Sequence, residues 1–560
     1  MENKHIATVL KFWAQLMELH EQNSFKIKTL TNAAFKIGKL TTRLADKSEE
    51  EIATIDGIGA STAKTIRELL EKGSIAALKI LEDATPRGVI EILHIKGLGP
   101  KKVGIIWKEL GIESVNDLYY ACCENRLVTL KGFGAKTQQE IKQLIEFTMN
   151  NHGKLLYARA ETIHLLLVSQ LHELLAPNKL LYQLSVVGSM RRKCEVIDSL
   201  HYLIACNELP TIIETLTNWH QLTNVKITSE NIIEATTKEQ ATIVFHFCNI
   251  KEFAFQQFIL TGNDEHVKRI LTLLNGKTDF ENEPAIYQSA GYHFIEPELR
   301  ENRIEFEYSD TNLISYADLK GALHNHSTWS DGIHSIKEMA LYCRDQLGLN
   351  YLGICDHSRS AFYANGLNVE RVREQHLEID LLNQQLAPFK IFKGIESDIL
   401  YDGSLDYPDE VLAMFDFIVA SVHSNLKMDK NKATERLLNA IKNPYTTILG
   451  HPTGRLLLGR KGYEIDYEAI IDACVQHHVV LEINANPMRL DIDWRWHQTA
   501  IQKGAYVAIN PDAHHKEGIS DMQYGIHIAR KGGINASQCL NAKNTTEIEQ
   551  WFEKRKKKIA

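Results

Sequence analysis

The sequence predicts a chain of several domains: a helical amino-terminal third, a mixed α+β middle region, and a carboxyl-terminal barrel in which strands alternate with helices. Three observations support this order. A pair of glycines recurs in one pattern through the first 150 residues, a strand in the middle region leads into Gly-Ser and two arginines, and seven short apolar runs follow residue 320. A length of 560 residues is enough for three or more domains with sizeable cores.

The amino-terminal third repeats the pattern aliphatic, polar, Gly, apolar, Gly at residues 55–59, 95–99 and 130–134. Each copy precedes a predicted helix, which begins near Ala60, Pro100 or Ala135. The glycines let the backbone turn tightly and approach a phosphate, which would meet free N–H groups at the helix start. The pattern resembles the helix-hairpin-helix, which binds DNA backbone without reading sequence, although the third copy is also compatible with a structural turn. The candidate DNA contacts are Gly57, Gly59, Gly97, Gly99, Gly132, Gly134, Lys64, Lys101, Lys102 and Lys136.

The middle region contains the segment Val186-Val-Gly-Ser-Met-Arg-Arg192. The apolar residues predict a strand, and the Gly-Ser and paired arginines after it form a natural cradle for a triphosphate. Nucleotidyl transfer additionally needs carboxylates that hold two metal ions against the 3′ hydroxyl and the triphosphate.

The carboxyl-terminal region contains seven apolar runs, and each ends in a polar residue able to bind metal or substrate. Helical patterns lie between them, for example at 336–347 and 467–477. Strands that alternate with helices predict a mostly parallel sheet, and seven units suggest a closed or nearly closed barrel. Functional groups gather at the carboxyl ends of barrel strands. The runs are 321–326, 351–357, 391–396, 417–423, 446–451, 479–484 and 506–514.

Nine histidines and acids at or just beyond the run ends are candidate metal ligands. Imidazole with carboxylate and no thiolate suits zinc, manganese or iron, and nine ligands exceed the need of one ion, so two or three ions are expected. Such a cluster stabilises the attacking and leaving oxygens of a phosphate ester, so phosphoester hydrolysis is the chemistry it fits best. The candidates are His324, His326, Asp331, His357, Glu396, His423, His451, Asp512 and His514.

These motifs look like the PHP (polymerase and histidinol phosphatase) domain, a distorted (β/α)7 barrel with a trinuclear metal site. The resemblance implies one ion at His324, His326, Glu396 and Asp512. It implies a second at Glu396, His423 and His451, and a third at Asp331, His357 and His514. Glu396, Asp512 and His514 would then be the catalytic residues, and Arg455 and Arg489 are candidate contacts to the substrate phosphate.

The middle region, with the hairpins before it and the barrel after it, resembles the palm of a family X DNA polymerase, a nucleotidyltransferase-like α+β domain with a short thumb. The resemblance covers nearly the whole chain, and the fused barrel is the form found in bacterial members. It implies domains at 1–90 (hairpins), 91–152 (fingers-like, with further hairpins), 153–262 (palm), 263–316 (thumb and linker) and 317–560 (barrel). Ser189 and Arg192 would match the nucleotide-phosphate contacts.

The three metal-binding acids of that palm are expected to be lost. Counting from Arg192, the Asp-x-Asp pair falls on Ser199 and His201, and the third acid falls on Val244. Asp198 lies one residue away, and a slip of one residue points a strand side chain to the opposite face. Neutral imidazoles cannot replace three carboxylates around Mg²⁺. The nucleotide site is therefore expected to be vestigial.

The composition of the chain limits which binding partners and which cellular compartment are expected. A formal net charge of −8 argues against binding to nucleic acid by overall charge, so DNA contacts must be local. The nine cysteines lack a Cys-x-x-Cys pair, which favours reduced thiols. No apolar run has membrane-spanning length, so a cytoplasmic protein is expected, with a monomer favoured. The basic run 554–558 is expected to end a solvated helix.

The first functional hypothesis is a DNA-binding, metal-dependent phosphoesterase of DNA repair. It would act as a 3′–5′ exonuclease or trim 3′ ends of gapped or 3′-ended duplexes, on an inactive polymerase scaffold. The second is a working gap-filling polymerase with an attached nuclease. The third is a phosphatase of small esters, such as histidinol phosphate, on a DNA-binding scaffold.

Overall fold

The computed structural model describes residues 1–40, 42–95, 97–149, 153–176, 181–238, 240–307 and 312–559. The chain divides into two compact units, Met1–Glu146 and Phe147–Ala560. No described helix is both long and apolar enough to cross a membrane.

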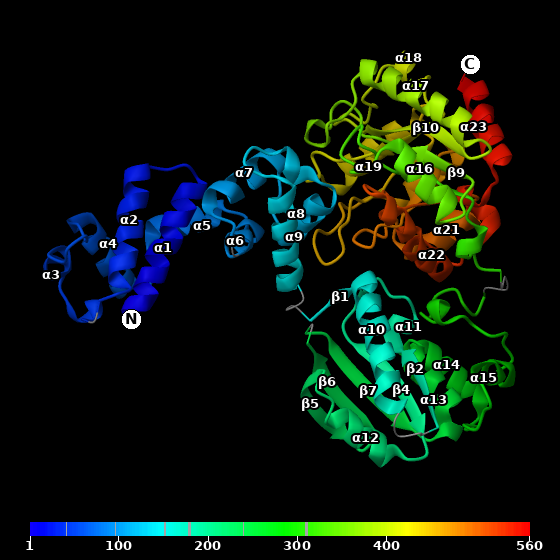
Figure 1. The fold of residues 1–560 in the computed structure, drawn as a ribbon, viewed down its shortest axis with the longest axis horizontal. Helices are drawn as coiled ribbons and strands as arrows, with labels where there is room; N and C mark the ends of the chain where they lie inside the picture. Colours follow the sequence, from blue (N-terminus) through cyan, green and yellow to red (C-terminus); the bar gives the residue numbers. More distant parts are fainter. Residues whose placement is uncertain are drawn as a thin grey trace. The chain divides into compact units, whose positions relative to one another are not determined.

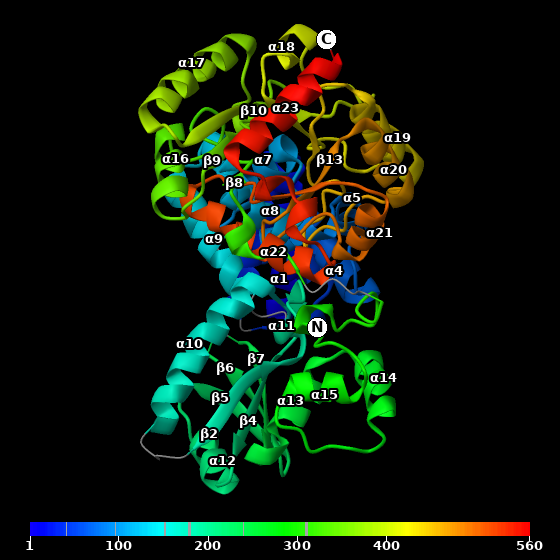
Figure 2. The ribbon, with the colours of Figure 1, turned by 90° about the vertical axis from the view of Figure 1, so that its right-hand side faces the viewer.

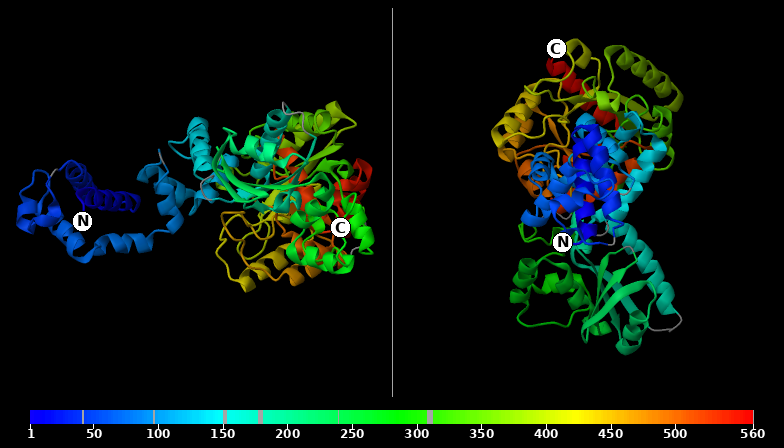
Figure 3. Two further views of the ribbon diagram at one scale, coloured as in Figure 1. Left: turned by 90° about the horizontal axis from the view of Figure 1, so that it is seen from below. Right: turned by 90° about the vertical axis from the view of Figure 1, so that its left-hand side faces the viewer.

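The described residues of the first unit are helical (Figure 3). Each glycine motif lies immediately before a helix, and the predicted helix starts at Ala60, Pro100 and Ala135 are confirmed. The helices are α1 (Asn3–Leu19), α2 (Ser24–Ile37), α3 (Glu49–Ala53), α4 (Ala60–Lys72), α5 (Ala76–Ala84), α6 (Arg87–Leu93), α7 (Pro100–Leu110), α8 (Val115–Cys123) and α9 (Ala135–Met149).

Each residue of the three glycine motifs has a distinct structural role. The first glycine of each has a left-handed φ, +82° at Gly57, +91° at Gly97 and +87° at Gly132, a conformation that costs other residues roughly 1–2 kcal/mol. The apolar residue between each pair of glycines is buried, and Leu98 is an example. The second glycine precedes the helix, as Gly99 does for α7, and leaves its first N–H groups uncovered by a side chain.

The second unit begins with a five-stranded sheet of order β2-β4-β7-β6-β5 (Figure 2). Helices α10 (Tyr157–Leu175) and α12 (Leu209–Thr217) pack on one face, and α13 (Phe253–Thr261) packs on the other. The strands are β2 (Tyr182–Val187), β4 (Leu200–Cys206), β5 (Leu222–Ser229), β6 (Ile232–Thr237) and β7 (Thr242–Cys248), and a separate pair joins β1 (Leu155–Leu156) to β3 (Val196–Ile197).

A small helical cluster follows the sheet. Its apolar core gathers residues from α13, α14 (Asp264–Leu274) and α15 (Glu283–Ser289), with Phe258 and Tyr287 fully buried. Part of the segment expected to join it to the barrel, residues 308–311, lies outside the described residues.

The carboxyl-terminal region is a seven-stranded parallel sheet of order β14-β13-β12-β11-β10-β9-β8, drawn in green to orange in Figure 1. A bridge between Asn325 and Ala513 joins the segments that continue its two edge strands, so the barrel is nearly closed, as predicted. The strands are β8 (Gly321–Ala322), β9 (Tyr351–Ile354), β10 (Lys390–Asp398), β11 (Phe417–Ser421), β12 (Ile448–Leu449), β13 (Val480–Asn484) and β14 (Val507–Asn510).

Helices surround the barrel strands and bury two apolar layers against them. The inside of the barrel holds the Phe417 ring, for which Gly353 and Gly394 leave room: a Cβ on either would lie 2.6 Å from its Cζ. The helices are α16 (Ile336–Asp345), α17 (Val369–Leu386), α18 (Asp409–Leu412), α19 (Lys430–Lys442), α20 (Tyr467–His477), α21 (His497–Gln502), α22 (Met522–Lys531) and α23 (Thr545–Ile559).

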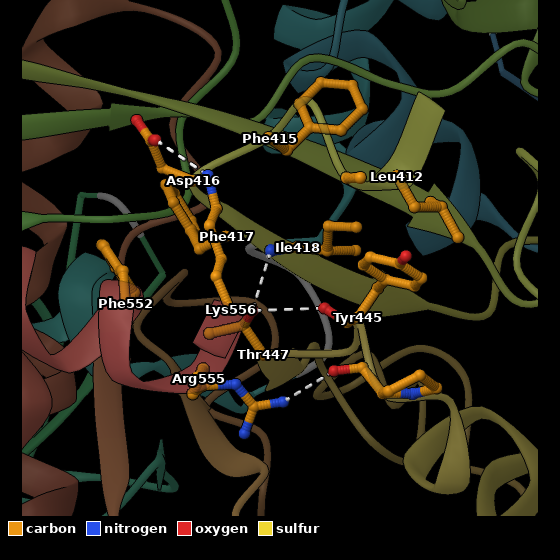
Figure 4. A pocket seen from close by; sticks show the side chains of 12 residues that line it. Leu412, Phe415, Asp416, Phe417, Ile418, Tyr445, Thr447, Phe552, Arg555 and Lys556 are labelled. Atoms are coloured by element: carbon orange, nitrogen blue, oxygen red, sulfur yellow. Dashed lines mark hydrogen bonds and ion pairs between the residues drawn. The ribbon is translucent and has the colours of Figure 1, made fainter. Parts of the chain in front are cut away.

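Helix α23 closes the amino-terminal end of the barrel, where Phe552 stacks on Phe417 with ring centroids 5.1 Å apart. A cavity of about 210 Å³ lies there, between α23 and the starts of β11 and β12 (Figure 4). Arg555 donates to backbone carbonyls, among them the oxygen of His478, and burial lowers the pKa of its guanidinium to about 10. The expectation that residues 554–558 simply end a solvated helix is therefore wrong at Arg555.

Candidate metal centre

The candidate ligands converge at the carboxyl-terminal end of the barrel, opposite the cavity of Figure 4. Glu396 lies within β10, and the other eight candidates follow the ends of their strands. His324 and His326 lie just beyond the short strand β8, with ring centroids 5.3 Å apart, so both point to the same site as expected. All nine candidates are brought together by the fold.

Glu396 occupies the centre of the cluster. Its Oε1 lies 3.3 Å from His324 Nε2, and the same oxygen lies 3.2 Å from His423 Nε2 and 3.0 Å from His451 Nε2. Its Oε2 lies 3.0 Å from His357 Nδ1. One carboxylate thus faces imidazoles from several different strands, which is the geometry expected of a bridging ligand.

Two further acids complete the cluster. Asp512 Oδ1 lies 3.2 Å from His326 Nε2, and Asp331 lies 3.5 Å from both His357 Nε2 and His514 Nε2. His326, Asp331, His357 and His514 form one compact group of potential ligand atoms. His324, His326 and Asp512 form a second, and His357, Glu396 and His423 a third. These groups overlap the ion assignment implied by the PHP resemblance, with His326 and His357 each shared between two groups.

Hydrogen bonds behind the cluster fix which imidazole nitrogen faces it. His324 Nδ1 lies 2.8 Å from Glu482 Oε1, and His423 Nδ1 lies 2.6 Å from Asp398 Oδ1. Ionised carboxylates can only accept, so each Nδ1 carries a proton, and Nε2 is the nitrogen turned toward the cluster. His514 Nδ1 likewise donates to a backbone carbonyl, that of Asp512, at 3.0 Å.

Glu482 and Asp398 are functional residues that the sequence analysis missed. Glu482 also accepts the backbone N–H of His451 at 2.7 Å, so it orients two candidate ligands. A signal was present: an acid within the apolar strand β13, and an acid two residues after Glu396, on the same face of β10, both need a polar partner inside the protein.

Asp356 is a third missed acid, and it fixes the loop that carries Asp331. Its carboxylate accepts the backbone N–H of Ser327 at 2.8 Å and that of Ser330 at 3.1 Å, and Gln375 Nε2 donates to it at 2.6 Å. These bonds satisfy a fully buried acid and hold the loop without using Asp356 as a ligand.

Two candidate ligands have strained backbones. His451 has φ +23° and Asp512 has φ +54°, values that residues with a Cβ rarely adopt. Such conformations persist where surrounding contacts enforce them, and they concentrate at functional sites. Both residues lie directly after a strand end, where the chain turns its side chain into the barrel mouth.

The donor set fits divalent metal ions. His326 Nδ1, His324 Nε2 and Glu396 Oε2 are buried, and within the described residues they have no hydrogen-bond partner. Burial opposes ionisation of Glu396, but the facing His423, His324 and His357 outweigh it and hold the pKa of the carboxyl well below its usual range. Burial, together with His514 and His357, lowers the pKa of His326 to about 3, so its imidazole is neutral. Burial opposes protonation of His324, His357 and His423, but the facing acids outweigh it and raise the pKa of these three imidazoles. Metal binds neutral imidazole and ionised carboxylate, so an ion would displace those protons.

The two arginines proposed as phosphate contacts differ. Arg489 is buried beside the cluster, with its Nε 3.8 Å from Asp512 Oδ2. Arg455 is held internally: its Nε donates to the Arg489 carbonyl at 2.9 Å, and its NH1 donates to Asp493 at 2.9 Å. Because these bonds occupy the guanidinium, the structure gives no support to Arg455 as a phosphate contact.

The five-stranded sheet carries imidazoles at and beside the positions where the family X resemblance implies metal-binding acids. His201 lies beside Val244 in the parallel pair β4–β7, the pairing that the residue count predicts. His201 Nδ1 lies 3.0 Å from His246 Nε2, and Ser199 Oγ lies 2.8 Å from His201 Nε2. Burial lowers the pKa of both imidazoles, that of His246 to about 4, so both are neutral near pH 7. Asp198 points elsewhere, with its carboxylate 73% exposed and 3.1 Å from Lys154 Nζ.

The two arginines of the expected triphosphate cradle are bound within the protein. Arg192 donates to Glu301 Oε1 at 3.0 Å and to the Thr261 carbonyl at 2.7 Å. Arg191 pairs with Glu283 at 2.5 Å, and this carboxylate also contacts the buried Arg300 at 2.6 Å. Ser189 lies beside the arginines, at the start of the four-residue helix α11 (Gly188–Arg191).

The lysines near the glycine motifs reach solvent. Lys101 and Lys136 are exposed in the first turns of α7 and α9, and Lys64 is exposed in the second turn of α4. Lys102 is half-buried and lies 5.6 Å from the ring centroid of Phe133, the apolar residue of the third motif. The second and third motifs are therefore neighbours in space, which the sequence did not show.

Comparisons with known proteins agree with this arrangement. Residues 1–75 match a model described as a helix-hairpin-helix domain, and residues 89–143 match a SAM-like helix-hairpin-helix tandem. The chain is 34% identical over 575 aligned residues to the DNA polymerase/3′–5′ exonuclease PolX of Bacillus subtilis, and the alignment covers 99% of this chain and 100% of that protein. The chain belongs to the bacterial family X DNA polymerases that carry a carboxyl-terminal PHP domain.

Other relatives match a smaller part of this PHP-bearing family X chain. A probable phosphatase of Thermoanaerobacter sp. (strain X514) is 27% identical over 32% of this chain and 75% of its own length. A probable phosphatase of Vibrio atlanticus is 25% identical over 40% of this chain and 89% of its own length. The family membership covers the whole chain, whereas the relatives named phosphatases match only a third or so of it.

Proposed function

We propose that this family X member is a DNA-binding, metal-dependent phosphoesterase that removes nucleotides or blocking groups from DNA 3′ ends, and that its polymerase palm does not incorporate nucleotides. One contrast carries the proposal. Nine candidate ligands converge in the barrel, while the three positions that would hold the polymerase ions carry Ser199, His201 and Val244. The name of the Bacillus subtilis relative, which includes a 3′–5′ exonuclease, supports the nuclease half.

The barrel residues would hold two or three divalent ions, with manganese and zinc the best match to the donors. Such ions lower the pKa of water and neutralise the charge that develops on a phosphate ester. Glu396 would place one carboxylate oxygen on either side of the cluster, and Asp512 and His514 would complete its rim. Arg489, buried beside Asp512, would add a fixed positive charge where the phosphate approaches.

The hairpins would supply the DNA affinity that a chain with net charge −8 lacks overall. The N–H groups at the starts of α4 and α7, with Lys64 and Lys101 beside them, suit phosphates of either strand. A gapped or 3′-ended duplex is the proposed partner, with the chain acting as a monomer.

The palm would be inactive for two independent reasons. Neutral imidazoles cannot bind Mg²⁺ as carboxylates do. In addition, Glu301 and Thr261 bind Arg192, so a triphosphate would have to break these contacts first.

One assay tests both halves of the proposal. A gapped duplex labelled on the primer is incubated with Mn²⁺, with and without deoxynucleotides, and the product length is measured. We expect shortening in both conditions, abolished in Glu396→Gln, whose amide cannot bridge cations. The exposed Glu468→Gln on α20 serves as the matched control and should leave shortening unchanged.

Two outcomes would reject the proposal. Primer extension that disappears in Ser189→Ala or Arg192→Ala would show a working gap-filling polymerase. Fast hydrolysis of a small ester such as histidinol phosphate, with the primer left intact, would favour the phosphatase alternative, which the names of the shorter relatives make a real candidate.

A further inference from the structure

Two imidazoles meet on one face of the five-stranded sheet, outside the candidate metal centre of the barrel. His201 Nδ1 lies 3.0 Å from His246 Nε2, and the two rings stack with an interplanar angle of 17°. Two ring nitrogens at this distance cannot both present lone pairs to each other without repulsion. Either a proton lies between them in an N–H···N hydrogen bond, or a metal ion binds both.

The separation of the two nitrogens is close to that of two ligands on one zinc ion. Zinc binds imidazole nitrogen at about 2.0–2.1 Å with tetrahedral angles, which places two such nitrogens about 3.3 Å apart. A small rotation of either side chain would therefore admit the ion. His201 and His246 are both half-buried, so an ion can reach them from solvent.

Ser199 fixes which nitrogen of His201 is available. Ser199 Oγ lies 2.8 Å from His201 Nε2. When this hydroxyl accepts the Nε2–H, the lone pair is left on Nδ1, as in metal sites where an outer hydrogen bond sets the tautomer of the imidazole. Burial lowers the pKa of His201 and that of His246, so both rings are neutral near pH 7, the form that binds metal.

Glu234 adds a carboxylate on the same face of the sheet. His201 lies beside Val244 in the parallel pair β4–β7, and Val244 lies beside Glu234 in the antiparallel pair β7–β6 (Figure 2). His246 follows Val244 by two residues on β7, so its side chain projects from this face too. Burial lowers the pKa of His201, and the negative charge of Glu234 partly opposes that effect, which places the carboxylate close to the imidazoles. Glu234 is exposed, so its side chain can turn toward them.

We propose that His201, His246 and Glu234 bind one zinc ion on the five-stranded sheet. Two imidazoles and one carboxylate are a donor set that zinc takes in proteins, with the fourth tetrahedral position left to water. Mg²⁺ prefers oxygen ligands, so the same residues would discriminate against it.

This ion would differ from the pair of ions that a polymerase palm holds. Of the three ligands, only His201 stands at a position where the family X resemblance implies an acid. The ion would join the neighbouring strands β4, β7 and β6, and it depends neither on the barrel cluster nor on the proposed nuclease.

A count of bound zinc tests the site. The full chain is freed of metal with a chelator, dialysed against a zinc buffer and analysed by mass spectrometry of the metal. We expect His201→Gln, His246→Gln and Glu234→Gln each to bind one equivalent less than the parent. The exposed His220→Gln, between α12 and β5, is the matched control and should keep the count of the parent.

Two checks separate this ion from the barrel and from misfolding. In a chain that already carries Glu396→Gln, adding His246→Gln should again remove one equivalent, because the two sites are independent. Glutamine keeps a polar side chain of similar size, so the metal-free variants should unfold at the temperature of the metal-free parent in circular dichroism.

Oxidation locates the ion without counting it. Cu²⁺ binds nitrogen ligands more tightly than zinc does, and with ascorbate it oxidises the imidazoles that hold it. Peptide mass spectrometry should find oxidation at His201 and His246 well above that at His220. Equal zinc counts in the parent and both histidine variants, or oxidation at His201 and His246 no greater than at His220, would overturn the inference. A count that falls in the histidine variants but not in Glu234→Gln would overturn Glu234 as the third ligand.

Discussion

At the residue scale, the candidate metal centre depends on acids that are not candidate ligands themselves but hold the ligand imidazoles in place. Glu482 binds the Nδ1–H of His324 and the backbone of His451, so it fixes the orientation of two imidazoles. Substituting such partners typically costs 10- to 100-fold in metal affinity. We expect Glu482→Gln to weaken Mn²⁺ or Zn²⁺ binding by about that factor, measured by calorimetry, with the fold retained. An affinity equal to that of the parent would show that the imidazoles are oriented without it.

A buried histidine outside the metal centre predicts a dependence of stability on pH. His497 is fully buried beneath Gly532, and burial lowers its pKa to about 4. The unfolded chain binds a proton near pH 6.5 while the folded chain does not. Its contribution is therefore present above that pH and is lost as the pH falls from about 6.5 to 4.

The shift corresponds to about 3 kcal/mol if the site stays intact. We expect His497→Gln to flatten the decline in the free energy of unfolding between pH 7 and 4, measured by urea unfolding at several pH values. A decline identical in slope to that of the parent would mean that His497 becomes solvated before it titrates.

At the element scale, the first glycine of a motif is expected to matter for folding and the second for DNA binding. Gly97 has φ +91°, so Gly97→Ala should destabilise the first unit by roughly 1–2 kcal/mol in thermal unfolding. Gly99 has φ −82°, and a Cβ there would meet no atom within 4 Å. Serine is a good residue at a helix start, so Gly99→Ser should leave stability unchanged.

The same Gly99→Ser change should weaken DNA binding, because the hydroxyl competes with a phosphate for the N–H groups of α7. The measurement is binding of a fluorescent duplex at two salt concentrations, with Ala77→Ser, at an exposed position of α5, as a control for an added hydroxyl. Unaltered binding in Gly99→Ser would leave the second motif as a structural turn only.

The elements also show what a sequence can and cannot predict. The helix starts, the seven strands and the nine candidate ligands were predicted from the spacing of apolar residues and the positions of glycines. The rule that the carboxyl ends of parallel strands lie at one edge of the sheet brought the ligands together. Glu482 and Asp398 were missed because a residue inside a strand gives no sign of which neighbour it faces. The internal bonds of Arg455 could not be foreseen, because its partners, Asp493 and the backbone of Arg489, lie more than thirty residues away in the sequence.

At the scale of the whole molecule, the second unit ties its palm-like sheet region to the barrel through a buried lysine. Lys531, 1% exposed at the end of α22, lies 2.5 Å from Glu301 and donates to the Arg192 carbonyl at 2.9 Å. Burial opposes the charge on Glu301, but Lys531 and Arg192 outweigh it and lower the pKa of this acid. Removing one partner of an isolated buried pair costs about 3–5 kcal/mol, and the loss here should be smaller because Arg192 still faces Glu301.

We therefore expect Lys531→Met to lower the unfolding temperature of the second unit clearly, by scanning calorimetry. The half-buried Lys516→Met should not, since the ammonium of that lysine makes only a long ion pair, 3.9 Å from Glu517. Lys531→Met combined with Glu301→Gln should cost less than the sum of the two single losses, because the two side chains are in direct contact. Loss of stability that is additive in the double variant would contradict a direct coupling.

This lysine also gives the palm-like region a structural role that does not depend on its chemistry. Lys531 binds the carbonyl of Arg192, a candidate nucleotide contact, and the barrel face around it also packs Tyr524 and His527 against Tyr157. Deleting the palm-like region would expose the Lys531 ammonium and the rings of Tyr524 and His527 to water. The polymerase-like half thus forms part of the support on which the barrel stands, so its packing residues are constrained whether or not it incorporates nucleotides.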